Sequence, residues 1–308
     1  MATVFTRQRS AVRVCHRPPR ETPAQRGFLR VRGRAPFASI RPDAREVARE
    51  FVREFLDSTR ERRWTAGRSF LDHHGVSDER TSALRGATYR RDGRAVVELK
   101  SERPLDPDLL QLAGDGIRVA VAAGEPGADQ LASDCAGALR ERRWPGDELL
   151  ANHLDSLAGR GPAALLRPLA VSLDELSEIL EGDPIHGGGR IDRLTGEVWH
   201  RAQIDYAVEV GEEDPDDEDP DRWLWVDCEG SRDGYRDMED FIATVADPHR
   251  AELLAVAIEG RGAFRRFRDV LHRWPDLVDR WYAFSDDRRI GRAREWLADA
   301  GYRPADAR

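Results

Sequence analysis

Five carboxylates lie close together in the sequence, around an expected change from strand to helix. They are Asp227, Glu229, Asp233, Asp237 and Asp240. Carboxylate oxygens are the usual ligands of Mg²⁺, and a bound metal ion can assist phosphodiester hydrolysis. Acidic residues at a helix N-terminus also complement the helix dipole without any ligand. A metal-dependent phosphoesterase is therefore one alternative, beside a purely structural role for these carboxylates.

A second group of residues is suited to anions. The segment GRGAFRRFRDVLHRWP, residues 260–275, carries arginines among aromatic rings. Its candidate binding residues are Arg261, Arg265, Arg266 and Arg268. The guanidinium group matches phosphate geometry, so a nucleic-acid-associated protein that uses this arginine face is a second alternative.

The spacing of the apolar residues in this segment favours a packed helix. Phe264, Phe267, Leu271 and Trp274 recur at i, i+3, i+7 and i+10. This spacing predicts rings that point into a core, with the arginines facing outward. Proteins that bind single-stranded nucleic acid need exposed rings for stacking. We therefore expect a core helix with a solvated basic face.

Two features of composition weaken the nucleic-acid alternative further. Only one of the 49 basic Lys and Arg residues, Lys100, is a lysine, a bias that GC-rich codons produce. Residues 201–250 hold 17 acidic residues against 5 arginines, a net charge of −12. The negative potential around these residues repels phosphate and attracts basic partners toward the protein. Our leading hypothesis is a non-catalytic protein that acts by binding a partner protein.

The overall composition predicts a water-soluble cytoplasmic protein without a membrane partner. Charged residues make up 34% of the 308 residues, the net charge is −8 and the mean hydropathy is −0.63. No run of about 18 apolar residues is present. Cys15, Cys135 and Cys228 are far apart and show no CxxC spacing, so we expect reduced thiols, no zinc site and no cofactor.

The first 41 residues differ from the rest of the chain. They contain ten arginines, the single acid Glu21 and several prolines, and they show no helical periodicity. We expect a disordered basic segment. Back-translation of Val12-Arg13-Val14 resembles the T-loop of a transfer-RNA gene. We therefore favour a segment that is not native over an arm that grips phosphates.

Residues 42–157 predict an N-terminal α+β domain. Helices are expected from Asp43, after Ser77, and over residues 128–141 and 146–157. Asp92-Gly93 predicts a hairpin turn, because both residues tolerate positive φ. The run GIRVAVAAG, residues 116–124, predicts a strand. Residues 158–171, rich in glycine and proline, predict a linker.

Residues 172–308 predict a second small domain. Ser172 and Glu175 form a capping box before a helix that Gly182 ends. A hairpin is expected to turn at Thr195-Gly196, and RWLWVDC alternates as a strand does. Four helical stretches follow. The first has apolar residues from Tyr235 to Val245 on one side of the helix, and the second begins at Asp247-Pro248. The third is the segment 260–275, and the last one restarts at Ser285. The predicted fold class is α+β: two small domains, the second a short antiparallel sheet packed with about four to five helices.

Five blocks in the second domain carry a family resemblance. They are GGGRIDRLTGEVW, SRDGYRDMEDFI, IEGRGAFRRFRDVL, WYAF and AREWLADAG. In this order and spacing they resemble the bacterial Uncharacterised Protein Family 0158 over roughly residues 172–303. The resemblance implies a bacterial origin and supports the domain boundary. It implies no activity and no catalytic residues.

Overall fold

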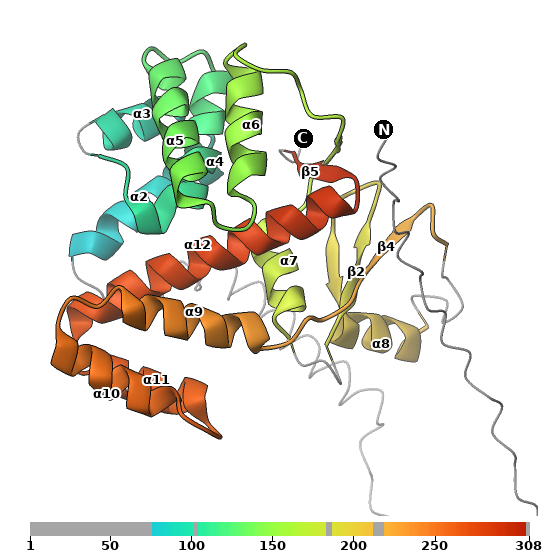
Figure 1. Ribbon diagram of the computed structural model, residues 1–308. Coiled ribbons are helices and arrows are strands. Elements are labelled where there is room, and N and C mark those ends of the chain that lie inside the picture. Colours follow the sequence, from blue (N-terminus) through green and yellow to red (C-terminus); the bar gives the residue numbers. More distant parts are fainter. Residues whose placement is uncertain (1–75, 102–103, 183–186, 212–218, 306–308) are drawn as a thin grey trace, which may run out of the picture. The chain divides into compact units, whose positions relative to one another are not determined.

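The computed structural model describes residues 76–101, 104–182, 187–211 and 219–305 (Figure 1). All of them lie in one compact unit, Glu61–Arg308. The expectations for residues 1–41 and for a helix at Asp43 lie outside the described residues. The fold is α+β, as predicted, and its three-stranded antiparallel sheet lies in the C-terminal part.

Residues 76–157, the N-terminal half below, form helices around one apolar core. They are α2 (Val76–Tyr89), α3 (Gly93–Ser101), a short 3₁₀ helix (Pro107–Leu109), α4 (Leu110–Ala122), α5 (Ala128–Arg142) and α6 (Asp147–Leu157). The helices predicted over 128–141 and 146–157 are confirmed. The core contains Leu84, Val96, Ile117, Leu139 and Leu150, each at most 2% exposed.

Two predicted strand features in this half are wrong. Asp92 does not begin a hairpin turn; its carboxylate accepts the Ala95 N–H at 3.0 Å and so caps α3. Residues 116–124 belong mainly to α4, which is buried on most sides and surrounded by helices. A short apolar run buried on all sides cannot be assigned to strand or helix from its periodicity. The described residues of this half are helical, so the α+β prediction is wrong for them.

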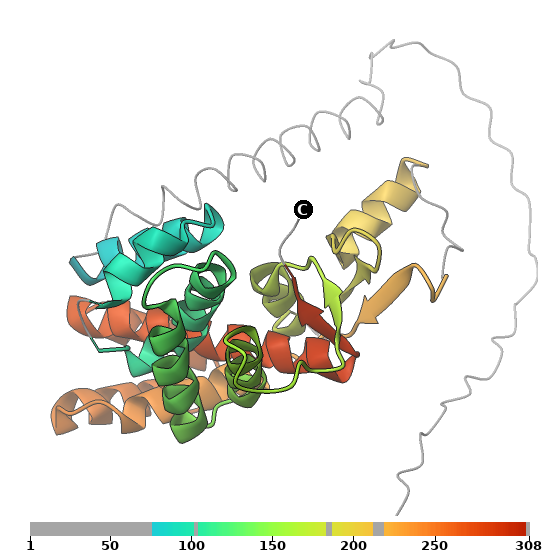
Figure 2. The same ribbon diagram turned by 90° about the horizontal axis from the view of Figure 1, so that it is seen from above.

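The C-terminal part, residues 167–305, contains a small three-stranded sheet. Its strands β2 (Gly189–Asp192), β3 (Val198–His200) and β4 (Trp223–Val226) pair antiparallel in the order β3-β2-β4. The predicted hairpin and the predicted strand at 223–226 are confirmed. Gly196 closes the hairpin with φ +80, a conformation that glycine adopts at little cost. The sheet and helix α8 (Arg201–Glu209) lie beyond the N-terminal helices, at one end of the long helix α12 (Figure 2).

Local capping residues determine where two helices of this part begin. The Ser172 hydroxyl accepts the Glu175 N–H and begins α7 (Leu173–Leu180), as predicted. Asp247 caps α10 (Pro248–Ile258), with proline in the first turn, also as predicted. Helices α9 (Arg232–Ala243) and α11 (Ala263–Leu271) both contact α10. Strand β1 (Arg167–Leu169) pairs in parallel with β5 (Tyr302–Pro304).

The last helix differs from its prediction. Helix α12 runs without a break from Pro275 to Asp299, so Ser285 is not a restart. Neither glycine nor proline follows Ser285 until Gly291, and Phe284 is buried in the same aromatic cluster as Phe241 and Phe267. Continuous packing on both sides therefore overrides the capping tendency of the serine.

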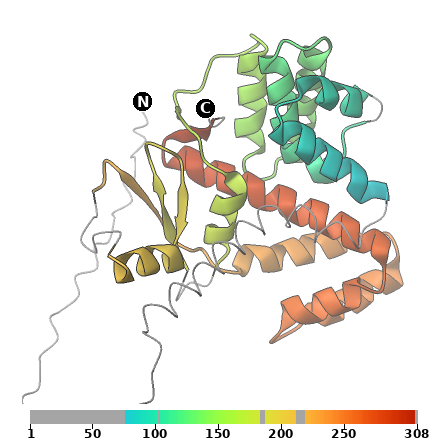
Figure 3. The same ribbon diagram turned by 180° about the vertical axis from the view of Figure 1, so that it is seen from behind.

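Helix α12 joins the two halves. It runs between the N-terminal helices and α9–α11, and it contacts α4, α6, α7 and α9 (Figures 1 and 3). The turn at Pro145-Gly146 rests on its backbone: a Cβ on Gly146 would overlap the Gly291 carbonyl, and a Cβ on Gly291 would overlap the Pro145 carbonyl. Within the described residues, none of the helices combines the length and the apolar character that crossing a membrane requires.

Candidate binding site

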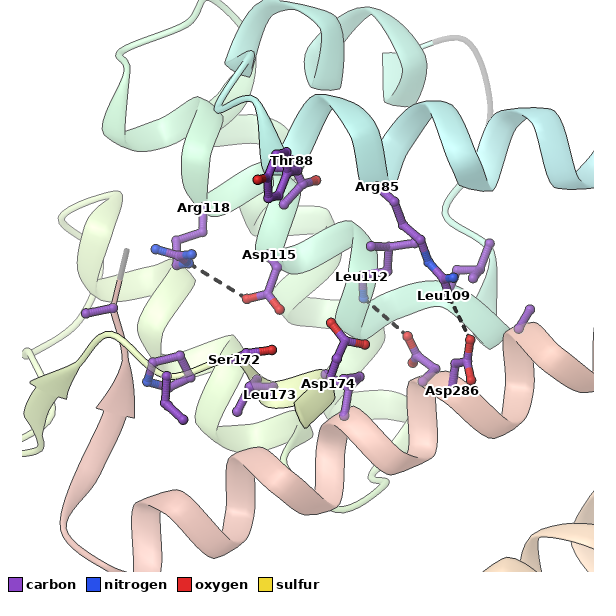
Figure 4. Close-up of a pocket in the computed structure, with 17 residues that line it drawn as sticks. Arg85, Thr88, Leu109, Leu112, Asp115, Arg118, Ser172, Leu173, Asp174 and Asp286 are labelled. Carbon is purple, nitrogen blue, oxygen red and sulfur yellow. Dashed lines mark hydrogen bonds and ion pairs between the residues drawn. The ribbon is translucent and has the colours of Figure 1, made fainter. Parts of the chain in front are cut away.

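A pocket of about 570 Å³ opens where α2, α4, α7 and α12 meet (Figure 4). Its walls carry apolar side chains from four elements. These include Leu109, Leu112, Leu173, Ala283 and Ile290. Charged side chains stand among them, namely Arg85, Asp115, Arg118, Asp174, Asp286 and Asp287. The pocket thus combines apolar walls with an excess of carboxylates.

Asp287 lines the pocket and is almost fully buried. Its carboxylate accepts the backbone N–H groups of Gln111 at 2.8 Å and Leu112 at 3.2 Å, at the start of α4. Arg142 donates to it at 2.7 Å. Burial raises the pKa of Asp287 to about 6, although Arg142 and the two N–H groups act in the opposite direction.

The same network continues through buried polar side chains. Arg142 also pairs with Asp147 at 2.7 Å, and the Gln111 amide donates to Asp147 at 2.9 Å. From α12, Arg294 donates to the Gln111 side chain at 2.8 Å and to Asp115 at 2.8 Å. Buried polar groups require such partners to offset their lost hydration. The network therefore holds α4, α5, α6 and α12 in one arrangement.

Besides Asp287, two further pocket carboxylates are paired with arginines, and one is not. Asp286 pairs with Arg85 at 2.7 Å, and Asp115 pairs with Arg294 and approaches Arg118 at 3.7 Å. Asp174 forms no hydrogen bond or ion pair with the described residues through its side chain. Figure 4 shows it reaching from the start of α7 toward the space between α4 and α12.

The surroundings of Asp174 disfavour its charge. Its side chain is exposed to solvent through the pocket mouth, but the pocket walls surround it and replace part of its hydration. The loss of surrounding water raises the pKa of Asp174, and the negative charge of Asp286 adds to the rise, while Arg85 opposes it. A cation that entered the pocket would stabilise the ionised carboxylate.

The five carboxylates predicted from sequence are engaged in other contacts or exposed. Asp237 is buried and pairs with Arg288 at 2.6 Å and Arg292 at 2.8 Å. Asp240 pairs with Arg288 and Asp233 with Arg236, whereas Asp227 and Glu229 are exposed. Across the part of the chain that the structure describes, no group of three or more His, Cys, Asp or Glu residues is placed to hold a metal ion.

The four arginines predicted to bind differ in their surroundings. Arg266 donates to backbone carbonyls at the end of α10 and in the following turn, those of Ala257 at 3.0 Å, Glu259 and Arg261. It therefore closes the turn between α10 and α11. Arg261, Arg265 and Arg268 are exposed. Phe264, expected in the core, is 44% exposed, so that prediction is wrong; Phe267 is buried as expected.

The pocket itself was not predicted from the sequence. Asp115, Asp174 and Asp286 lie 59 or more residues apart, and only the packing of α12 brings them together. In the sequence Asp174 looks like an ordinary acid in a first helical turn, which the helix dipole favours. No local pattern distinguishes it from such a residue.

Comparisons with known proteins bear on the C-terminal part. Residues 190–307 match the model of Uncharacterised protein family (UPF0158). UPF0158 protein PA5073 of Pseudomonas aeruginosa is 29% identical over 147 residues, which cover 46% of this chain and 89% of that protein. No solved structure matches the chain. The resemblance seen in the sequence is thus confirmed for the C-terminal part of the chain, over residues 190–307.

Proposed function

We propose that this protein acts by binding a partner protein, and that the pocket between α2, α4, α7 and α12 receives a lysine or arginine side chain of that partner. The observation that carries the proposal is Asp174, a carboxylate in the pocket that has no cationic partner among the described residues. The proposal assigns no catalytic step.

The chemistry of the walls supports a long cationic side chain as the ligand. Lysine and arginine combine an apolar stem with a charged end. The apolar surfaces of Leu112, Leu173 and Ile290 suit the stem, and Asp174 suits the charge. A pocket of about 570 Å³ is larger than one side chain and has room for neighbouring residues of a peptide.

Short peptides that differ only in charge test the proposal. An array of heptapeptides with a central arginine is probed with the full chain, beside the same peptides with citrulline, which keeps the shape and removes the charge. The strongest binder is then measured by calorimetry. We expect arginine peptides to bind and citrulline peptides to bind about tenfold or more weakly, as loss of a charged hydrogen bond predicts.

Two matched variants assign the binding to the pocket. Asp174→Asn removes the pocket charge; Asp129→Asn removes an equivalent exposed acid from the first turn of α5, outside the pocket. We expect only Asp174→Asn to weaken arginine-peptide binding. Equal affinity for citrulline peptides, or equal loss in both variants, would rule out Asp174 as the recognition group.

A further inference from the structure

One side of α11 combines an exposed ring with arginines. Phe264, Arg265 and Arg268 share one side of α11, and Arg261 lies in the turn directly before the helix. We call these four residues the α11 face. The Phe264 ring lies against Gly234 of α9, where an added Cβ would come within 3.3 Å of it. The glycine thus leaves room for the ring, which remains 44% exposed.

The three arginines of the α11 face are available to a ligand. The Arg265 side chain is 85% exposed and approaches Asp269 at 3.9 Å, a loose surface pair of little strength. Arg261 and Arg268 are exposed and form no side-chain hydrogen bond or ion pair with the described residues. Arg266, in contrast, is held by backbone carbonyls and is not part of this face.

We propose that the α11 face binds single-stranded nucleic acid, with a base stacked on Phe264 and the flanking phosphates paired with Arg261, Arg265 and Arg268. Binding of single strands combines aromatic platforms with positive charge, because every base offers a flat surface and every linkage a phosphate. In a duplex the bases are already stacked on one another. The face therefore favours a single strand over a duplex. This surface is separate from the pocket of the proposed function.

An acidic protein segment is the competing ligand. It would pair with the same arginines, but it would not need a flat ring beside them. The contribution of Phe264 therefore separates the two ligands.

The test measures fluorescence anisotropy of labelled 12-nucleotide single strands of RNA and DNA with the full chain, at several salt concentrations. A DNA duplex and a polyglutamate peptide serve as comparison ligands. We expect single strands to bind more tightly than either, with an affinity that falls as salt rises. Absence of single-strand binding, or polyglutamate binding of equal strength, would overturn the proposal.

Variants locate the binding. Reversal of Arg261, Arg265 and Arg268 to Glu is compared with reversal of Arg90, Arg94 and Arg201, which are exposed arginines outside α11 and the turn before it. Only the first triple variant is expected to abolish single-strand binding and its salt dependence. Phe264→Ala is expected to weaken binding about tenfold while leaving most of the salt dependence, as loss of one stacked base predicts. Equal loss in both triple variants, or unchanged affinity in a folded Phe264→Ala protein, would overturn the proposal.

Discussion

Two phenylalanines of α11, three residues apart, have different roles. Phe267 is 2% exposed and packs edge-on against Phe241 and Trp281, whereas Phe264 is 44% exposed. We expect Phe267→Ala to lower the free energy of unfolding by ~3 to 5 kcal/mol, as for other buried phenylalanines. Phe264→Ala should cost much less. Urea denaturation of both variants checks this, and similar losses would show that Phe264 is a core residue.

A single histidine on α6 makes stability depend on pH. Removal from water lowers the pKa of His153 to about 4, and the positive charges of Arg118, Arg303 and Arg294 act in the same direction. In the unfolded chain its pKa is about 6.5. The unfolded chain therefore takes up a proton first as pH falls. The contribution of neutral His153 is complete above pH 6.5 and is lost as the pH falls toward 4.

Replacing His153 with Gln tests this assignment. From pH 7 to pH 4 the wild-type protein should lose more stability than His153→Gln, as measured by urea unfolding at each pH. Parallel pH profiles would mean that His153 takes up its proton as readily in the folded state as in the unfolded chain.

At the scale of elements, Asp287 of α12 serves as the acidic cap of α4. Its raised pKa of about 6 means that the folded protein binds a proton more readily than the unfolded chain. This contribution to stability is complete below the ordinary aspartate pKa and is lost as pH rises through about 6. His153 acts in the opposite sense over the same range.

The variant Asp287→Asn separates these two effects. Between pH 7 and pH 4 only the wild-type protein gains stability from protonation of residue 287, by an amount on the order of a few kcal/mol. The difference in unfolding free energy between the two proteins should therefore shift in favour of wild type on acidification. A shift in favour of the variant would show that the ionised carboxylate, held by Arg142, is the stabilising form.

Elements were predictable where a local signal decides them. Ser172, Asp247-Pro248 and Gly196 act through their own backbone and a neighbouring N–H, and the helices and hairpin they mark are present. Prediction failed where burial decides. Residues 116–122 form a helix because α4 is enclosed by α2, α3, α5 and α6. Ser285 lies within α12 because both halves pack against that helix. An Asp92-Gly93 pair suits a hairpin and a helix cap equally well.

At the scale of the molecule, the pocket is a product of contacts between distant segments. Arg85, Asp174 and Asp286 meet only after α2, α7 and α12 have packed, so periodicity in any one segment could not reveal them. The fold class and the family resemblance of the C-terminal part were accessible from the sequence, whereas the site was not. The predicted boundary at residues 158–171 stays a prediction.

A fragment of residues 172–308 tests how far the C-terminal part depends on the rest. In the fragment Arg294 loses Gln111 and Asp115, and Asp287 loses Arg142. Breaking buried pairs in this way costs ~3 to 5 kcal/mol each. We expect the fragment to unfold at a lower temperature than the full chain in circular dichroism melts. An unchanged melting temperature would establish that the two halves fold independently.

The contact between Gly146 and Gly291 links the residue type at position 291 of α12 to the presence of the N-terminal half. Gly291 is required because the Pro145 backbone lies against it, whereas Gly146 is favoured both by the Gly291 backbone and by its own φ of +75. A relative that retains α12 but lacks the N-terminal half is released from that requirement, and alanine, the stronger helix former, is then favoured at the position of Gly291. In relatives, glycine at the position of Gly291 would thus accompany the N-terminal helices, and alanine at that position would accompany their absence.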